Sequence, residues 1–220
     1  MGSTNILTKT QKSFLELFGK ESFSQKFYLS GGTALAGFYI PYRFSEDLDF
    51  FSEEEVDTSE IVAFLKSIKK IIGFDNFDFN TSFNRNLFFL TLPHEKLKLE
   101  FTYYPFAQIN SSKVEFGIKI DSIEDIAVNK LFTIYQSPRS RDFIDLYVII
   151  AKYNFSISEL IKKAKIKFDW HVDPLKLGSQ FLLAEELKDY PKLIDQLNES
   201  DWQDFFKEEA KKLKQTIIEG

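Results

Sequence analysis

The sequence contains no cysteine and only two histidines. The absence of thiols excludes disulfide bonds and thiolate metal sites. Neither His94 nor His171 has a second metal-ligating residue at the spacing that zinc sites use. No apolar run approaches the roughly 18 residues that a membrane-spanning helix needs. We therefore expect neither a thiolate or histidine metal centre nor an association with the membrane.

Positive charge is not in excess either. The formal net charge of the 220-residue chain is -5, whereas general nucleic-acid-binding proteins usually carry a basic surface. The N-terminal segment MGSTNILTKTQ lacks the apolar core of a secretory signal peptide. With cysteine absent as well, we expect a cytoplasmic location. The length fits one large domain or two small ones.

The pattern of apolar residues changes near residue 121. Several earlier segments alternate like strands, whereas later segments have helical periodicity. The expected strands are 26–30, 46–51, 76–81, 86–92, 96–104 and 113–120, and the expected helices are 6–19, 33–40, 58–72, 122–136, 141–153, 156–165, 174–189 and 201–218. This pattern predicts an α+β protein with an α/β domain over 1–121 and a helical domain over 122–220. We expect the two domains to share a cleft.

Two aspartates in the expected strand 46–51 are the first candidate site. Asp47 and Asp49 alternate, so their side chains lie on one face of the strand. Adjacent carboxylates repel each other unless a cation lies between them, and hard divalent cations prefer oxygen ligands. A pair this short also occurs by chance as two solvated acids at a sheet edge. The motif alone therefore favours the solvated pair.

The segment Gly31-Gly32-Thr33, upstream of these acids, favours the metal interpretation. Glycines after a strand allow the backbone to approach a ligand closely, and the start of the next helix offers free N–H groups to phosphate. The Thr33 hydroxyl adds a further donor. A Gly-Gly pair alone is only a turn, but its combination with the two aspartates predicts a phosphate-binding turn beside a metal-binding pair.

A third acid, Glu100, lies on the polar face of the expected strand 96–104 together with Lys98 and Thr102. A neighbouring strand would bring Glu100 beside the aspartate pair. Three carboxylates can hold two metal ions about 3.5–4 Å apart, which suits in-line displacement at phosphorus. The alternative is an ordinary surface glutamate.

The helical half contains a lysine in an unusual position. Lys130 lies on the apolar stripe of the expected helix 122–136, where it either extends to water or points into a cleft and binds phosphate. Asp142 and Asp145 share a face of the next helix and follow Arg139. This Arg-Asp run either contributes to a site or serves helix capping and surface pairing.

Three blocks of the sequence resemble a known family. The segments GGTALA, RFSEDLDFF and DIAVNKLFTIYQSPRSRDFIDLY are similar to those of the AbiEii-type abortive-infection toxins, a bacterial branch of the DNA-polymerase-β-like nucleotidyltransferases. The resemblance covers roughly residues 27 to 150. It implies a polymerase-β-like core with a mixed sheet, followed by a C-terminal helical bundle that completes the active-site cleft.

The resemblance also implies roles for individual residues. The implied nucleotide-binding residues are Gly31, Gly32, Thr33, Arg43, Ser45 and Lys130; the metal ligands are Asp47, Asp49 and Glu100; the catalytic set is these three acids with Lys130 and Asp142. Lys130 matches the essential lysine of the family, and Asp142 is favoured over Asp145 as the active-site acid. Two features depart from the pattern: the first block is often Gly-Ser, and the placement of Glu100 depends on an inferred strand register.

The implied activity is transfer of a nucleoside monophosphate from an NTP to an acceptor hydroxyl, dependent on Mg²⁺ or Mn²⁺. The implied role is the toxin of a toxin–antitoxin system that acts on tRNA, with a separate antitoxin protein as partner. An acceptor on a protein or a small molecule is the second reading, favoured by the acidic net charge. The third is an inactive nucleotide-binding module, against which the intact aspartate pair and Lys130 argue.

Overall fold

The computed structural model describes residues 6–219, and the chain divides into two compact units, Met1–Ser122 and Ile123–Gly220. Residues 1–5, part of the segment expected not to be a signal peptide, lie outside the described residues. Within the described range, no helix is both long and apolar enough to cross a membrane.

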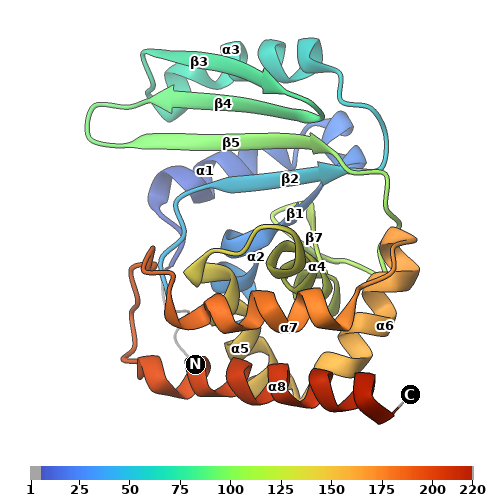
Figure 1. The fold of residues 1–220 in the computed structure, drawn as a ribbon. Helices are drawn as coiled ribbons and strands as arrows, with labels where there is room; N and C mark the ends of the chain where they lie inside the picture. The colour runs from blue at the N-terminus through green and yellow to red at the C-terminus, as the bar shows by residue number, and fades with distance from the viewer. Residues whose placement is uncertain (1–5, 220) are drawn as a thin grey trace. The chain divides into compact units, whose positions relative to one another are not determined.

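Unit 1 is built on a seven-stranded mixed sheet with the order β3-β4-β5-β2-β1-β7-β6. Its strands are β1 (Tyr28–Ser30), β2 (Leu48–Ser52), β3 (Asn76–Ser82), β4 (Arg85–Thr91), β5 (Lys96–Tyr103), β6 (Lys113–Glu115) and β7 (Ile118–Ile120). The pairs β2/β5 and β1/β7 are parallel, and the other neighbours are antiparallel. Figure 1 shows the long β3–β4–β5 meander followed by β2.

Helices α1 (Lys9–Phe18) and α3 (Thr58–Ile72) pack on one face of this sheet (Figure 1). Phenylalanines fill the space between them. The Phe18 ring lies 4.8 Å from that of Phe50 on β2, and Phe50 stacks on Phe101 of β5 at 4.9 Å between centroids. Burying each such side chain stabilises the fold by about 1.5–3 kcal/mol. This core fixes β2 and β5 side by side and leaves their polar residues on the opposite face.

Several expected elements of unit 1 are corrected by the structure. The expected strand 113–120 is a hairpin of two short strands, because Phe116 and Gly117 turn the chain with φ of 54° and 77°. The expected helix 33–40 is α2 (Gly31–Phe38), so the two glycines belong to its first turn and Pro41 does not end it. A short 3-10 helix, η1 (Ser22–Lys26), precedes β1 where strand was expected to begin. The helix 58–72 is confirmed.

Unit 2 is helical throughout its regular structure. Its elements are α4 (Ile123–Gln136), α5 (Ser140–Tyr153), α6 (Ile157–Phe168), α7 (Pro174–Leu182), the 3-10 turn η2 (Leu183–Glu185) and α8 (Glu199–Glu219). Buried Phe143, Phe181 and Phe206 join α5, α7 and α8. The expected helix 174–189 is too long, because α7 ends at Leu182 and is followed by η2 and irregular chain. The Asp189 carboxylate instead accepts hydrogen bonds from the Ser140 N–H and hydroxyl at 2.8 and 2.6 Å.

Candidate active site

The strand register brings the acids of unit 1 to one face of the sheet. Asp49 on β2 is directly opposite Glu100 on β5 and opposite Ser30 on β1. The Lys98 ammonium lies 2.7 Å from Asp47 Oδ2 and 3.7 Å from Glu100 Oε2. Since Lys98 and Glu100 alternate on β5, they share a face. Asp47, Asp49 and Glu100 therefore face the same side.

Asp47 lies one residue before β2, not within the strand as expected from 46–51. Side chains from other segments donate hydrogen bonds to the backbone carbonyls of the loop that precedes β2. The Gln11 amide donates to the carbonyls of Ser45 and Glu46 at 2.9 and 3.1 Å, and the Thr33 hydroxyl donates to the carbonyl of Asp47. These bonds satisfy carbonyl groups that precede β2 and lie outside the sheet ladder. The Thr33 hydroxyl, which the sequence suggested as a donor to phosphate, therefore donates to a backbone carbonyl here.

The glycine turn lies directly against two of the predicted site residues. Gly31 has φ of 70°, and a β-carbon there would lie 2.7 Å from Asp49 Oδ2. A β-carbon on Gly32 would lie 2.2 Å from Arg43 Nη2 and 3.0 Å from Ser45 Oγ. Real side chains would displace these groups. The glycines thus allow a carboxylate and a guanidinium to approach the backbone at the start of α2.

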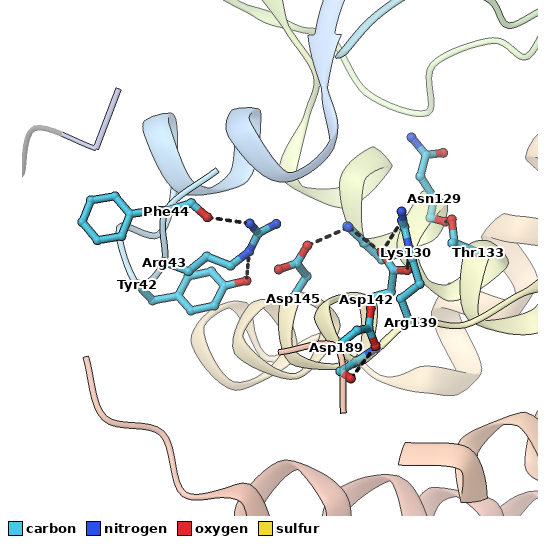
Figure 2. A network of polar contacts seen from close by, with 11 residues as sticks. Tyr42, Arg43, Phe44, Asn129, Lys130, Thr133, Arg139, Asp142, Asp145 and Asp189 are labelled. Atoms are coloured by element: carbon cyan, nitrogen blue, oxygen red, sulfur yellow. Dashed lines mark hydrogen bonds and ion pairs between the residues drawn. The ribbon is translucent and has the colours of Figure 1, made fainter. Parts of the chain in front are cut away.

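Arg43 is buried and held from two directions. Its Nε donates to the Tyr42 hydroxyl at 3.0 Å, and its Nη1 donates to the Phe44 carbonyl at 2.9 Å (Figure 2). A guanidinium fixed in this way is pre-organised for a phosphate, because less side-chain entropy is lost on binding. Unit 1 thus gathers the predicted glycines, Arg43, Ser45 and the three acids around the β1–α2 turn and the adjacent sheet face.

Glu100 has a partner that the sequence analysis did not anticipate. Arg85 at the start of β4 donates from Nε and Nη2 to the two Glu100 oxygens, both at 2.6 Å, and Thr102 donates to Oε1 at 3.0 Å. Burial works to raise the pKa of Glu100, but the Arg85 hydrogen bonds and charge, with Lys98, hold that pKa below its ordinary value. Burial likewise opposes the charge on Lys98, yet its bond to Asp47 and the nearby acids raise its pKa. Glu100 is therefore an ionised carboxylate.

These contacts decide how well the acids fit a divalent cation. The oxygen donors are of the kind that Mg²⁺ and Mn²⁺ prefer. Among residues 6–219, however, no three Asp, Glu, His or Cys side chains lie together in an arrangement that would hold a metal ion. Asp47 and Asp49 would supply ligand oxygens from one segment, although Asp47 Oδ2 contacts the Lys98 ammonium at 2.7 Å. Glu100 fits only if its oxygens leave Arg85.

Unit 2 brings the predicted Lys130 together with both candidate aspartates. The Lys130 ammonium lies 2.7 Å from Asp142 Oδ1 and 2.6 Å from Asp145 Oδ2, as Figure 2 shows. Arg139 Nε contacts the other Asp142 oxygen at 2.8 Å. Burial favours a higher pKa for Asp142, but Lys130 and Arg139 outweigh it and hold the pKa below the ordinary value. Lys130 thus joins α4 to α5 through these two ion pairs.

Asp121 is a buried acid that the sequence analysis missed. It accepts hydrogen bonds from the Ser30 hydroxyl at 2.6 Å and from the Gln108 amide at 2.7 Å. Ser30 immediately precedes the glycine turn, so Asp121 fixes the strand from which that turn departs. No motif marks it, because its partners are distant in the sequence. Arg85 and Gln11 were missed for the same reason.

Comparison with known proteins identifies the family. The profile described as "Nucleotidyl transferase AbiEii toxin, Type IV TA system" matches residues 13–216. The chain belongs to this AbiEii family. A protein of Aquifex aeolicus, the uncharacterized aq_aa25, is 29% identical over 164 residues, which cover 74% of this chain and 76% of the relative. The resemblance seen in the three sequence blocks is thereby confirmed.

Two crystal structures from Helicobacter pylori share the fold of this AbiEii chain. One, proposed to be a nucleotidyltransferase, matches with a TM-score of 0.61 at 22% identity and covers 96% of this chain and 94% of its own. The other, JHP933, matches with a TM-score of 0.60 at 23% identity and covers 96% and 91%. The expected α+β nucleotidyltransferase fold with a mixed sheet, followed by helices, is confirmed. The residue roles inferred for the site remain predictions.

Proposed function

We propose that this AbiEii chain is a nucleotidyltransferase that moves a nucleoside monophosphate from an NTP to an acceptor hydroxyl and depends on Mg²⁺ or Mn²⁺. The observation that carries the proposal is the meeting of Asp47, Asp49 and the Gly31–Gly32 turn in unit 1. An oxygen-rich pair beside the backbone N–H groups at the start of a helix suits a metal-bound triphosphate. Membership of a nucleotidyl transferase family supports the same chemistry.

In this proposal Asp47 and Asp49 would hold the divalent cation, which would supply charge neutralisation to the triphosphate when bound. The backbone at the start of α2 receives phosphate oxygens. Arg43 lies against Gly32, so its guanidinium adds positive charge at the same turn. The acceptor hydroxyl would lose its proton to solvent as its oxygen attacks the α-phosphorus; the bond from the α-phosphorus to the bridging oxygen of the β-phosphate would break, and pyrophosphate would leave.

Lys130 and Asp142 take different roles here. Lys130 is the proposed cation for the phosphates, as the family resemblance implies. Asp142 is already bonded to two cations and has a lowered pKa, which makes it a weak proton acceptor. We therefore assign Asp142, with Asp145, to positioning the Lys130 ammonium rather than to deprotonating the acceptor.

We propose tRNA in the cytoplasm as the acceptor, and a separate antitoxin protein as the partner that limits the activity. The support is membership of a family described as toxins of type IV toxin–antitoxin systems. The net charge of -5 is the observation that favours a protein or small-molecule acceptor instead. The experiment must therefore distinguish tRNA from protein and small-molecule acceptors.

The test uses each of four labelled NTPs with Mg²⁺ or Mn²⁺, and offers total tRNA, total protein and a small-molecule extract separately. We expect label on tRNA with the natural chain and none with Asp49→Asn. The matched control is Asp78→Asn, which alters an exposed aspartate of the same sheet and should keep full activity. Label on protein or small molecules alone overturns the tRNA acceptor, and no label from any NTP overturns the enzyme.

A growth experiment tests the toxin role. Overexpression of the natural chain should arrest growth, whereas Asp49→Asn and Asp49→Ala should not. Equal growth of all strains, with the proteins present at equal level, would refute the toxin.

A further inference from the structure

The Arg85–Glu100 pair is asymmetric in its exposure. The Glu100 side chain is only 8% exposed, whereas that of Arg85 is 53% exposed. Arg85 is the first residue of β4 and follows the Phe83–Asn84 turn, so its side chain reaches Glu100 from the edge of the polar sheet face. The carboxylate is thus fixed, whereas the guanidinium borders solvent. Of the two partners, Arg85 is the one that can leave.

The pair also satisfies Glu100 without any metal. Both oxygens accept from Arg85 at 2.6 Å, and Thr102 adds a third bond. Two parallel charge-assisted bonds of this kind are among the strongest side-chain contacts. A divalent cation at Asp49, which lies opposite Glu100 in the strand register, must compete with Arg85 for the Glu100 oxygens. Arg85 therefore weakens the third ligand of any metal ion bound there.

A nucleotide changes this competition, because phosphate oxygens match the planar guanidinium as well as a carboxylate does. We propose that Arg85 is an exchangeable partner of Glu100: a bound triphosphate takes the guanidinium, and Glu100 is released to the divalent cation. The inference rests on the proposed function. It makes the binding of nucleotide and of metal mutually reinforcing, since such coupling is reciprocal. Arg85 is a positioning residue in this scheme until nucleotide binds, and a phosphate ligand afterwards.

The test measures Mn²⁺ binding in the absence of turnover, from the loss of the electron paramagnetic resonance signal of free Mn²⁺. Without nucleotide, Arg85→Ala should bind Mn²⁺ about tenfold more tightly than the natural chain, which corresponds to about 1.4 kcal/mol. Adding an NTP analogue that cannot be cleaved at the α-phosphorus should tighten Mn²⁺ binding in the natural chain. The same addition should tighten it less in Arg85→Ala, and the analogue itself should bind that variant more weakly.

Arg85→Ala also removes a positive charge, which by itself would favour binding of a cation. The variants Glu100→Gln and Arg85→Ala/Glu100→Gln separate this general effect from the release of Glu100. If Glu100 is the released ligand, the gain from Arg85→Ala disappears in the Glu100→Gln background. If Arg85→Ala still tightens Mn²⁺ binding in the Glu100→Gln background, the effect comes from the lost charge alone, and the exchange is overturned. Arg85→Lys keeps the charge but loses the paired hydrogen bonds, so it should tighten Mn²⁺ binding less than Arg85→Ala does. If circular dichroism shows that Arg85→Ala does not fold, Arg85→Lys takes its place in the comparison.

The outcome separates this inference from the proposed function. Unchanged Mn²⁺ affinity in both Arg85 variants, while the natural chain still transfers nucleotides, overturns the exchange alone. A natural chain that binds neither the NTP analogue nor Mn²⁺ overturns both.

Discussion

Replacement of Lys130 by methionine should destabilise unit 2 strongly at neutral pH. Lys130 is 10% exposed in its side chain, and the carboxylates of Asp142 and Asp145 that it contacts are fully buried. Arg139 would remain near Asp142, but both acids would lose the ammonium. Breaking a buried ion pair on one side costs about 3–5 kcal/mol. For a chain of this size, each kcal/mol shifts Tm by about 2–4 °C, so Tm should fall by on the order of 10 °C.

The pH dependence identifies the cause. The pKa of Asp142 is lowered, so its pairing stabilises the natural chain above the unfolded pKa of about 3.9 and is lost as pH falls through the folded pKa. In Lys130→Met, Asp142 loses one of the two cations that hold its pKa down, so it takes up a proton more readily and the penalty for its less-paired charge fades on acidification. Thermal melts should therefore show the largest difference between the two proteins near pH 7 and a smaller one near pH 4. The exposed Lys152→Met is the control, expected within about 0.5 kcal/mol of the natural chain. Equal Tm values at pH 7, or a difference independent of pH, would refute this reasoning.

Two further substitutions test the buried Lys167–Asp125 ion pair of unit 2 and the glycine turn of unit 1. Lys167→Met leaves the fully buried Asp125 without the ammonium 2.6 Å away, and should cost about 3–5 kcal/mol in urea denaturation; Asp125→Leu/Lys167→Met should recover most of it. Gly31→Ala places a β-carbon 2.7 Å from Asp49 Oδ2 at φ of 70°, and should weaken Mn²⁺ binding as well as stability. Gly73→Ala is its control, because φ is 84° but no atom lies within 4 Å, so it should show only the backbone strain of about 1–2 kcal/mol. Equal Mn²⁺ binding by both glycine variants would contradict the role of the turn.

Local patterns in the sequence were sufficient for much of the fold. The polar face of β5, with Lys98, Glu100 and Thr102, follows from strand alternation alone. Helix α3 appears with the expected bounds because its periodicity is bracketed by Asp57 as N-cap and a left-handed Gly73. In these segments the short-range preferences and the final packing agree.

Contacts between distant segments were not predictable in the same way. The polar face of β5 carries no mark of the pairing that puts Glu100 opposite Asp49, and no spacing rule links Arg85 to Glu100 or Gln11 to the loop before β2. The helix 174–189 was overestimated for a related reason. The observed helix ends at Leu182, and Asp189 instead bonds to Ser140 of α5, a contact between distant segments that local periodicity does not encode.

Side-chain exposure distinguishes the ion pairs that can exchange partners from those that hold the fold. The cations that contact Glu100 and Asp47 reach solvent, with 53% exposure for Arg85 and 26% for Lys98. Each of these two cations can therefore be rehydrated if a divalent cation takes its place at the carboxylate. Lys130 has no such route, because its two acids would be left charged in the interior. We therefore expect a divalent cation at the acids of unit 1 and not at those of unit 2, and in the proposed function Lys130 would bind phosphate with its aspartates still attached.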